Sequence, residues 1–234
     1  MIDTLILTAA DLEARALARE LRLTPLSSLF HAAFERGPVR LAAVGLRAGQ
    51  LGPRWSALLD GGRPLVVSAG VCGALDPGLR CGDLVVPERV LDPGGGSLGA
   101  SPPHHLRALA CAPGAVHAGC LVTTREATVT AAAKAALRAR TGAVAVDMES
   151  AVILGAAAAA GCPALVVRGV SDEAGQEIPS ELIGLLGEDG RIRRGRALAL
   201  TVTRPRILSR AMELRRDTRH GLGAVAGLLA ALVA

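Results

Sequence analysis

Residues 143–174 read AVAVDMESAVILGAAAAAGCPALVVRGVSDEA, and this stretch decides the fold class. It begins with a short apolar run that is typical of a buried strand. A helix of small apolar residues follows, and it is predicted to stop at Gly161 because glycine favours the backbone conformation that ends a helix. A second apolar run, PALVVRGVSD (residues 163–172), predicts another buried strand. Strand, helix and strand in succession indicate an α/β fold.

The same alternation extends along the rest of the chain. Apolar runs that predict strands occupy residues 4–10, 39–46, 63–70, 82–91 and 119–124. Helices are predicted over residues 11–23, 51–59 and 130–141. Residues 92–105 are rich in glycine, proline and serine, which predicts a loop that is too short for a domain linker. We therefore expect a single domain over residues 1–234 with a mostly parallel sheet.

The composition is that of a globular protein. Half of the 234 residues are apolar and a fifth are charged. The aromatic residues are Phe30, Phe34 and Trp55 alone, too few for the stacking platforms of a single-strand nucleic-acid binder, so no nucleic-acid partner is expected. The five cysteines are scattered without a C-x-x-C pair, which favours free buried thiols in a reducing compartment.

The basic character of the chain is concentrated near its C-terminus. Residues 191–220 contain ten arginines and two acidic residues. The whole chain has a net charge of +5, so the rest of the chain has a negative net charge. Apolar residues spaced three or four apart from Ile207 to Leu232 predict a helix over residues 205–234. Its apolar end is shorter than the ~18–20 residues of a membrane span. Docking on the domain or a second subunit, and peripheral contact with the inner membrane, are both left open. The absence of a signal-peptide pattern favours a cytoplasmic protein.

Polar residues or glycines stand at the ends of four predicted strands. Ligands bind beyond the carboxyl ends of strands in open parallel sheets, so the four positions together predict one site. Each position also has a purely structural interpretation, as a helix cap, a first-turn acid or a turn glycine. The residues concerned are Glu13, the glycine-rich residues 68–78, the triplet Asp147, Met148 and Glu149, and Ser171 with Asp172.

These stretches together resemble the purine nucleoside phosphorylase/uridine phosphorylase superfamily over nearly the whole chain. The resemblance rests on VSAGVCGALDPGLRCGDLVVP (residues 67–87), on residues 143–174 and on the early Glu13. It implies a three-layer α/β/α fold with a mixed, mostly parallel central sheet. It also implies an enzyme that cleaves the N-glycosidic bond of a purine nucleoside and forms homo-oligomers.

Narrower resemblances indicate the substrate. The glutamate at position 13 makes the chain similar to the branch of the superfamily that contains methylthioadenosine/S-adenosylhomocysteine nucleosidase. Residues 75–87, 141–150 and 178–219 resemble the hopanoid-associated phosphorylase subgroup, which implies release of adenine from adenosylhopane in hopanoid biosynthesis. Methylthioadenosine/S-adenosylhomocysteine nucleosidase and futalosine hydrolase remain alternatives, as does a non-catalytic nucleoside-binding protein on the same fold.

The resemblance assigns Asp172 and Glu13 to the chemistry. Asp172 would serve N7 of the leaving base, with burial favouring its protonated form and Ser171 orienting it. Glu13 would position and deprotonate a water molecule. Whether water or phosphate attacks is left open, because a carboxylate repels phosphate whereas Arg47, which follows a strand, would attract it as a co-substrate.

Other residues are implied in binding the sugar and the base. Glu149 would accept hydrogen bonds from the ribose hydroxyls and stabilise the developing cation, with Met148 against the sugar and Asp147 beside it. The turn that brings the backbone close to the ligand is expected at Ser68, Ala69 and Gly70.

The base-binding stretch departs from the nucleosidase pattern. Residues 123–132 lack the aromatic residue that usually stacks on adenine, so the base is expected to pack on Val129, or on Phe30 or Phe34. His104 and His105 are expected in a solvated loop, the alternative being contact with the 5′ side of the sugar. No metal-ligand spacing such as H-E-x-x-H occurs, so neither a metal nor another cofactor is expected.

Overall fold

The structure is a computed structural model that describes residues 2–26, 32–185, 187–191, 193 and 205–233. Its strands are β1 (Thr4–Thr8), β2 (Thr24–Pro25), β3 (Ala33–Arg36), β4 (Val39–Ala43), β5 (Leu65–Ala74), β6 (Leu84–Val85), β7 (Arg89–Leu91), β8 (Ser97–Gly99), β9 (Val116–His117), β10 (Cys120–Thr123), β11 (Ala145–Asp147) and β12 (Ala164–Asp172). Its helices are α1 (Asp11–Glu20), α2 (Trp55–Leu59), α3 (Pro102–Cys111), α4 (Ala131–Thr141), α5 (Ser150–Ala159), α6 (Ser180–Ile183) and α8 (Pro205–Val233), with short 3₁₀ turns η1 (Leu46–Ala48) and η2 (Gly52–Arg54).

The strands form one mixed sheet in which β5 is the branch point. The order is β2-β3-β4-β1-β5-β11-β10-β7-β8, and β12 pairs with β5 and β6 off this path. β4, β1, β5 and β12 run parallel to one another, whereas β11 meets the end of β5 antiparallel. Antiparallel pairs otherwise occur between β12 and β6 and in the hairpins β2–β3–β4 and β7–β8. The predicted α/β fold with a mixed central sheet is confirmed.

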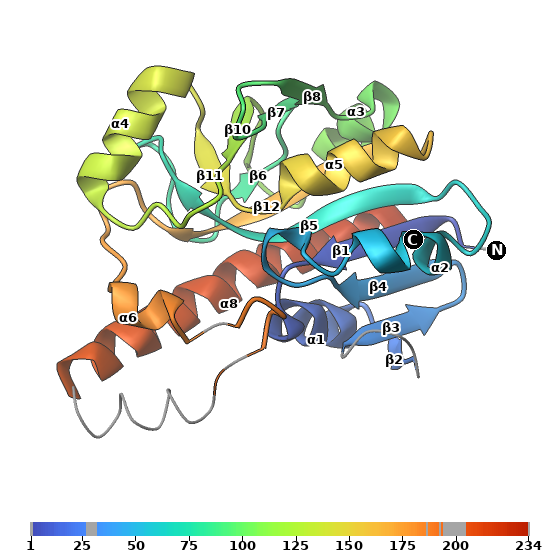
Figure 1. The fold of residues 1–234 in the computed structure, drawn as a ribbon, viewed down its shortest axis with the longest axis horizontal. Helices are drawn as coiled ribbons and strands as arrows, with labels where there is room; N and C mark the ends of the chain where they lie inside the picture. Colours follow the sequence, from blue (N-terminus) through green and yellow to red (C-terminus); the bar gives the residue numbers. More distant parts are fainter. Residues whose placement is uncertain (1, 27–31, 186, 192, 194–204, 234) are drawn as a thin grey trace.

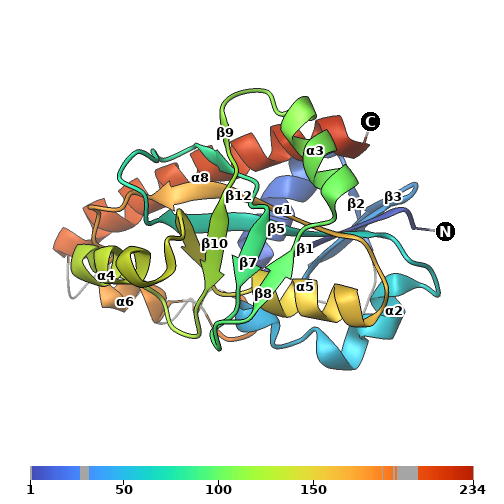
Figure 2. The same ribbon diagram turned by 90° about the horizontal axis from the view of Figure 1, so that it is seen from above.

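Helices cover both faces of this sheet and complete three layers (Figures 1 and 2). Successive strand residues point to opposite faces, so Leu7 of β1 and its neighbour Ile6 enter different cores. Leu7 packs in a cluster with Ile153 of α5 and with α2. Ile6 packs in the cluster that contains Leu17 of α1 and Leu228 of α8, together with residues of α3.

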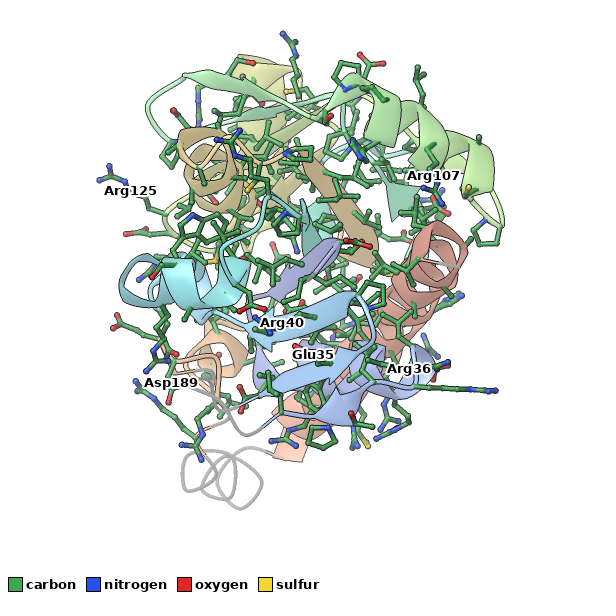
Figure 3. All side chains as sticks on the ribbon, turned by 90° about the vertical axis from the view of Figure 1, so that its right-hand side faces the viewer. Glu35, Arg36, Arg40, Arg107, Arg125 and Asp189 are labelled. Atoms are coloured by element: carbon green, nitrogen blue, oxygen red, sulfur yellow. The ribbon has the colours of Figure 1, made fainter. Side chains whose placement is uncertain are left out.

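The outer hairpin is tied to α2 by one arginine. Arg40 of β4 donates from Nε to Oε2 of Glu35 on β3, 2.7 Å away, and from Nη1 to the carbonyl of Leu58 at 3.2 Å (Figure 3). A largely buried guanidinium with a carbonyl and a carboxylate partner holds the edge of the sheet against the helix layer.

Helix α8 confirms the predicted C-terminal helix over residues 205–233 and runs along β12 (Figure 1). Its residues Leu222, Val225 and Leu229 are buried against the sheet, so its apolar side docks on the domain, as one of the two expectations held. The side chain of Ile207 and residue Ala234 lie outside the described residues. Over the part of the chain that the structure describes, no helix is long and apolar enough to cross a membrane.

The helix reaches the strand closely because glycines face each other. A Cβ atom on Gly169 of β12 would collide with the backbone of Gly221 on α8, and one on Gly221 would lie 3.0 Å from the carbonyl oxygen of Val170. Two backbones that approach this closely leave no room for a methyl group.

Three stretches differ from the sequence predictions. Residues 82–91 form two short strands rather than one, because Pro87 between them lacks the N–H that a continuous ladder needs. Residues 92–105, predicted as a loop, contain β8 and the start of α3 at Pro102, where proline suits the first turn of a helix. The turn predicted at residues 68–70 is wrong, because β5 continues to Ala74 with Gly70 at a φ of 151° inside the strand.

We expect Gly169→Ala to destabilise the fold by about 1–3 kcal/mol or more, the usual cost of overpacking a closely packed core. The colliding atoms belong to backbone and cannot rotate away. Urea denaturation of the purified variant measures the change. Gly223→Ala on α8 is the control, since a Cβ there meets nothing within 4 Å, and alanine in a helix interior stabilises by up to about 1 kcal/mol relative to glycine. Equal midpoints for the two variants would contradict the close contact.

Candidate active site

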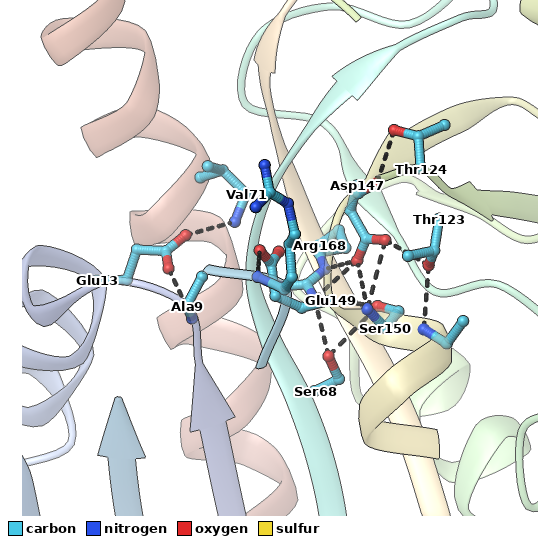
Figure 4. Close-up of polar contacts among 12 residues, drawn as sticks. Ala9, Glu13, Ser68, Val71, Thr123, Thr124, Asp147, Glu149, Ser150 and Arg168 are labelled. Atoms are coloured by element: carbon cyan, nitrogen blue, oxygen red, sulfur yellow. Dashed lines mark hydrogen bonds and ion pairs between the residues drawn. The ribbon is translucent and has the colours of Figure 1, made fainter. Parts of the chain in front are cut away.

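Polar side chains from four parts of the chain meet beside β5 (Figure 4). They come from the start of α1, from the middle of β5, from the junction of β11 with α5, and from the middle of β12. Of the residues that the sequence predicted at strand ends, Glu13, Asp147 and Glu149 belong to this group, and Ser171 and Asp172 lie at the end of β12. All five are buried.

Arg168 forms the centre of this network. Its side chain is 1% exposed, and it donates from Nε to Oδ2 of Asp147 at 2.9 Å. Its Nη2 donates to the hydroxyls of Ser68 at 2.8 Å and Ser150 at 3.0 Å. Burial lowers the pKa of Arg168, but the negative charges of Asp147, Glu149 and Glu13 more than offset this and raise it. The guanidinium is therefore a permanent buried cation that joins β12, β11, β5 and α5.

Asp147 is fully engaged by the protein. Its Oδ1 accepts from the hydroxyl of Thr123 at 2.7 Å, and its Oδ2 accepts from Arg168 and from the backbone N–H of Ser150 at 3.1 Å. Thr123 in turn accepts from the N–H of Ala151 at 3.0 Å. These bonds fix the first turn of α5 and agree with a structural role for Asp147 rather than the predicted contact with substrate.

Glu13 bridges α1 and β5. Its Oε2 accepts from the backbone N–H groups of Ala9 at 3.1 Å and Ala10 at 3.0 Å, which caps the start of α1. Its Oε1 accepts from the N–H of Val71 at 3.1 Å (Figure 4). The carboxylate lies beside Gly70, where a Cβ atom would stand 2.7 Å from Glu13 Oε1 and 2.6 Å from Arg168 Nη1. Gly70 is thus required by both its φ and the side chains around it.

Glu149 lies directly before α5 with its carboxylate buried. The backbone N–H of Arg47 donates to its Oε1 at 3.0 Å. Burial raises the pKa of Glu149 to about 7, and the negative charge of Asp147 adds to the rise, while Arg168 and the N–H of Arg47 act in the opposite direction. A buried acid that titrates near neutrality is a common mark of a functional site.

Asp172 ends β12 next to a β-bulge, and the sequence did not reveal its main partner. Its Oδ1 accepts from the hydroxyl of Ser171 at 2.8 Å, as the predicted orienting role requires. Its Oδ2 accepts from Nζ of Lys134 at 2.5 Å, and Lys134 is fully buried. The expectation that burial favours the protonated form of Asp172 did not include this ammonium, which is in direct contact with the carboxyl group. The register shift between Val170 and Asp172 places Asp172 opposite Gly73.

The side chain of Arg47 lies near the site, but its guanidinium contacts other protein groups. Its Nε donates to the carbonyl of Arg125 at 2.7 Å, and its Nη1 lies 3.7 Å from Oε1 of Glu188. Its backbone has a φ of 56°, a left-handed conformation, in η1. The predicted anion contact would require these bonds to change.

The model of one protein family, described as the phosphorylase superfamily, matches residues 54–202 of this chain. The chain belongs to the phosphorylase superfamily. It is an enzyme of the nucleosidase and nucleoside phosphorylase class.

Solved structures share the whole fold at low sequence identity. The 5′-methylthioadenosine/S-adenosylhomocysteine nucleosidase of Helicobacter pylori is 17% identical with a TM-score of 0.74, covering 99% of this chain and 97% of that one. The enzyme of the same name from Neisseria meningitidis is 18% identical with a TM-score of 0.72, covering 99% of each chain. The futalosine hydrolase of Helicobacter pylori is 17% identical with a TM-score of 0.73, covering 99% of this chain and 97% of that one. None of the curated proteins compared with the chain matches it significantly.

The remaining predicted site residues of this phosphorylase-superfamily chain lie in different surroundings. Ser68 and Ala69 are fully buried in β5, and Ser68 supports Arg168. Met148 and Val129 are half-buried, and the carbonyl of Val129 accepts from the N–H of Ile178 at 2.9 Å. Phe34 is buried in the core with residues of α1, so it is not placed to stack on the base.

Three further predictions concern groups outside the network. His105 is buried, and its Nε2 lies 2.9 Å from the carbonyl of Val86, so the prediction of a solvated residue is wrong. His104 hydrogen-bonds Ser101 at 3.1 Å. Phe30 lies outside the described residues. Within the described ranges, no group of His, Cys, Asp and Glu could hold a metal ion.

A cavity of about 630 Å³ adjoins the end of β12. Its lining includes Thr130, Glu173, Gln176, Ile178 and Arg210. Glu173 directly follows Asp172, so the cavity lies next to this end of the site.

The raised pKa of Glu149 predicts a pH-dependent stability. Because the folded pKa of about 7 exceeds the unfolded value of 4.5, the folded protein binds more protons in between. The free energy of unfolding therefore falls as pH rises from about 4.5 to about 7 and then levels off. Glu149→Gln removes this penalty, so we expect the variant to be more stable than the parent at pH 8 by up to about 3 kcal/mol, and equal to it at pH 4.

Urea denaturation at both pH values measures this difference. Glu20→Gln, at an exposed position near the end of α1, is the control. A Glu149→Gln variant that is equally stable or less stable than the parent at pH 8 would contradict the prediction that the buried charge of Glu149 destabilises the folded protein.

Proposed function

We propose that this enzyme releases the base of a purine nucleoside by cleaving the N-glycosidic bond. The observation that carries the proposal is the pair of buried acids with different partners, Glu149 with a raised pKa and Asp172 against a buried lysine. Glycosidic cleavage passes through an oxocarbenium-like sugar and needs an acid at the leaving group and negative charge near the sugar. Membership of the phosphorylase superfamily supports the same chemistry.

Asp172 serves the base. Its carboxyl group lies beside Gly73, where a Cβ atom would come within 2.9 Å of its Oδ2. The missing side chain leaves space at the carboxyl group. The Ser171 hydroxyl, anchored in turn on the carbonyl of Cys72 at 3.2 Å, holds the carboxyl orientation. A proton delivered to N7 turns the departing base into a neutral leaving group.

Glu149 serves the sugar. The N–H of Arg47 occupies one side of its Oε1, and the remaining lone pairs are acceptors for the ribose 2′- and 3′-hydroxyls. Those donors supply the hydrogen bonds that favour the ionised form, so substrate binding lowers the pKa of Glu149. The carboxylate then faces the positive charge that develops on the sugar. Met148, half-buried beside it, packs on the sugar face.

Water is the nucleophile that the charges favour. Glu13 presents a carboxylate next to Gly70, and a phosphate dianion would be repelled by it. The guanidinium of Arg168 is engaged by Asp147, Ser68 and Ser150, and that of Arg47 by Arg125 and Glu188. Glu13, ordered by three backbone N–H groups, positions the attacking water and accepts its proton.

Adenosylhopane is the substrate that we propose. The support is the resemblance of residues 75–87, 141–150 and 178–219 to the hopanoid-associated subgroup; residues 186, 192 and 194–204 of the last stretch lie outside the described residues. Methylthioadenosine, S-adenosylhomocysteine and futalosine are the alternative substrates, since the similar structures carry those names. The expected homo-oligomer and peripheral membrane contact stay predictions.

We expect the purified enzyme to release adenine from adenosylated hopanoid faster than from methylthioadenosine or futalosine, as measured by chromatography of the free base. Asp172→Asn should lower kcat by about 100- to 10,000-fold, the usual contribution of a general acid. Asp76→Asn is the control, because Asp76 pairs with Arg138 on the surface at 2.8 Å. Full activity of Asp172→Asn would contradict its role, and release from methylthioadenosine alone would exclude the lipid substrate.

Omitting phosphate should leave the rate of base release unchanged, because water attacks. The sugar product should be the free hydroxyl compound at every phosphate concentration, as read by phosphorus NMR or mass spectrometry. A product with a 1-phosphate group that forms only when phosphate is added would show that phosphate attacks, and would require the Arg47 side chain to leave its present partners.

A further inference from the structure

Lys134 is the only lysine of the chain, although lysine and arginine together number 26. Every other basic side chain of this type is an arginine, which keeps its proton under all ordinary conditions. A lysine can lose its proton in a buried setting and regain it. The single position that uses lysine is also the position in contact with Asp172.

Lys134 projects from the first turns of α4 and is 0% exposed. Its ammonium has three N–H donors and three acceptors, which are Asp172 Oδ2 at 2.5 Å, the carbonyl of Glu173 at 2.7 Å and the carbonyl of Gln176 at 3.0 Å. The carbonyls orient the ammonium, and Asp172 is the one partner that can accept a proton from it.

The charges near Lys134 come from several elements. Glu173 points to Arg80, 3.2 Å away, so its charge is partly balanced. Arg138, one turn further along α4, pairs with Asp76. The other ionisable groups of this region are Asp172 on β12, Asp217 on α8, Arg168, Asp147, and the thiols of Cys72 and Cys81. Asp172 therefore remains the direct charged partner of Lys134.

We propose that Lys134 is a positioning residue that supplies, through Asp172, the proton that the leaving base receives. This proposal rests on the proposed function and deepens it. In the free enzyme Asp172 accepts from both Ser171 and Lys134, as a carboxylate does, and a carboxylate has no proton to give. The neighbouring ammonium is the proton source that the geometry provides.

The proton balance closes within one turnover. As the C–N bond breaks, its electron pair passes to the base. The base takes a proton from the Asp172 carboxyl group, and an Nζ–H bond of Lys134 breaks to form the O–H bond on Asp172. Lys134 is left as a neutral amine and Asp172 as a carboxylate. Water adds to the sugar and loses one proton to Glu13, and Glu13 then releases a proton to solvent. A proton taken up from solvent restores the ammonium of Lys134.

A purely structural role for Lys134 makes different predictions. The ammonium also holds the backbone of Glu173 and Gln176, so its loss would disturb substrate binding and change KM at every pH. The proton-supply role instead affects kcat and depends on pH. Without Lys134, Asp172 must arrive protonated from solution, and this becomes rarer as pH rises.

Lys134→Met tests this difference, with kcat and KM for the purine nucleoside measured from pH 5 to pH 9. We expect kcat at pH 8 to fall at least about 100-fold, KM to change less than about 3-fold, and the deficit to shrink toward pH 5. The control is Arg138→Met, which removes a basic side chain from the same helix and should stay within about 2-fold throughout. A loss of equal size at every pH, or a change confined to KM, would overturn the proposal.

Two further measurements keep the test decisive if Lys134→Met does not fold. The double variant Lys134→Met with Asp172→Asn removes both buried charges, and we expect it to be as active as Asp172→Asn alone, because Lys134 acts through Asp172. An additional tenfold loss would overturn the proposal.

The wild-type protein offers the second measurement. Isotope-labelled lysine gives the chain one side-chain NMR signal, since Lys134 is the sole lysine. We expect that signal to titrate at the pH where kcat/KM declines on the alkaline side. Titration at a clearly different pH would overturn the proposal. Failure of the wild type to release base from any nucleoside would overturn the proposed function and this role together, whereas an active wild type with a pH-independent Lys134→Met deficit would overturn this role alone.

Discussion

The buried ion pair of Arg168 and Asp147 is the interaction on which the site depends. Both side chains are 1% exposed, and they join β12 to β11 across the branch point of the sheet. The β11–α5 junction carries Glu149, so the position of this acid follows from the pair. Removing one partner would leave a buried charge without compensation, which typically costs 3–5 kcal/mol, about half the stability of a domain. The hydroxyls of Ser68 and Ser150 accept the hydrogen bonds that Nη2 of Arg168 donates.

The remaining acids of the site differ in how their charge is balanced. Asp172 has Lys134, and Glu13 has three backbone N–H groups. Glu149 has one backbone N–H and only the more distant influence of Arg168, and burial raises its pKa to about 7. A stability-optimised protein would not leave a carboxylate in this state. The imbalance makes sense where a ligand supplies the missing donors, and this singles out Glu149 as the sugar-facing acid.

The sequence predicted the acids better than the cations, for a physical reason. Glu13, Glu149 and Asp172 lie at or just after the ends of strands, where ligands bind in sheets of this kind. Their side chains are short and stay close to the backbone, so their positions in the sequence predict their positions in the site. Lys134 reaches Asp172 from a helix 38 residues earlier through a long side chain, and no local pattern reports that distance. Two features of the sequence marked these cations: Arg168 lies inside an apolar predicted strand, and Lys134 is the single lysine. Neither feature shows which acidic residue pairs with the cation, so the sequence alone did not assign a role to either.

The wrong turn predicted in β5 and the position of Asp172 at the end of β12 have one geometric origin. A glycine after an apolar run usually marks a turn, but here Gly70 and Gly73 lie within a strand whose neighbours need the space. The bulge adds one residue to β12 against β5, so Asp172 comes to lie opposite Gly73. A side chain at Gly73 would occupy the position of the carboxylate. The bulge and the glycine therefore act together, since each is useful to Asp172 only in the presence of the other.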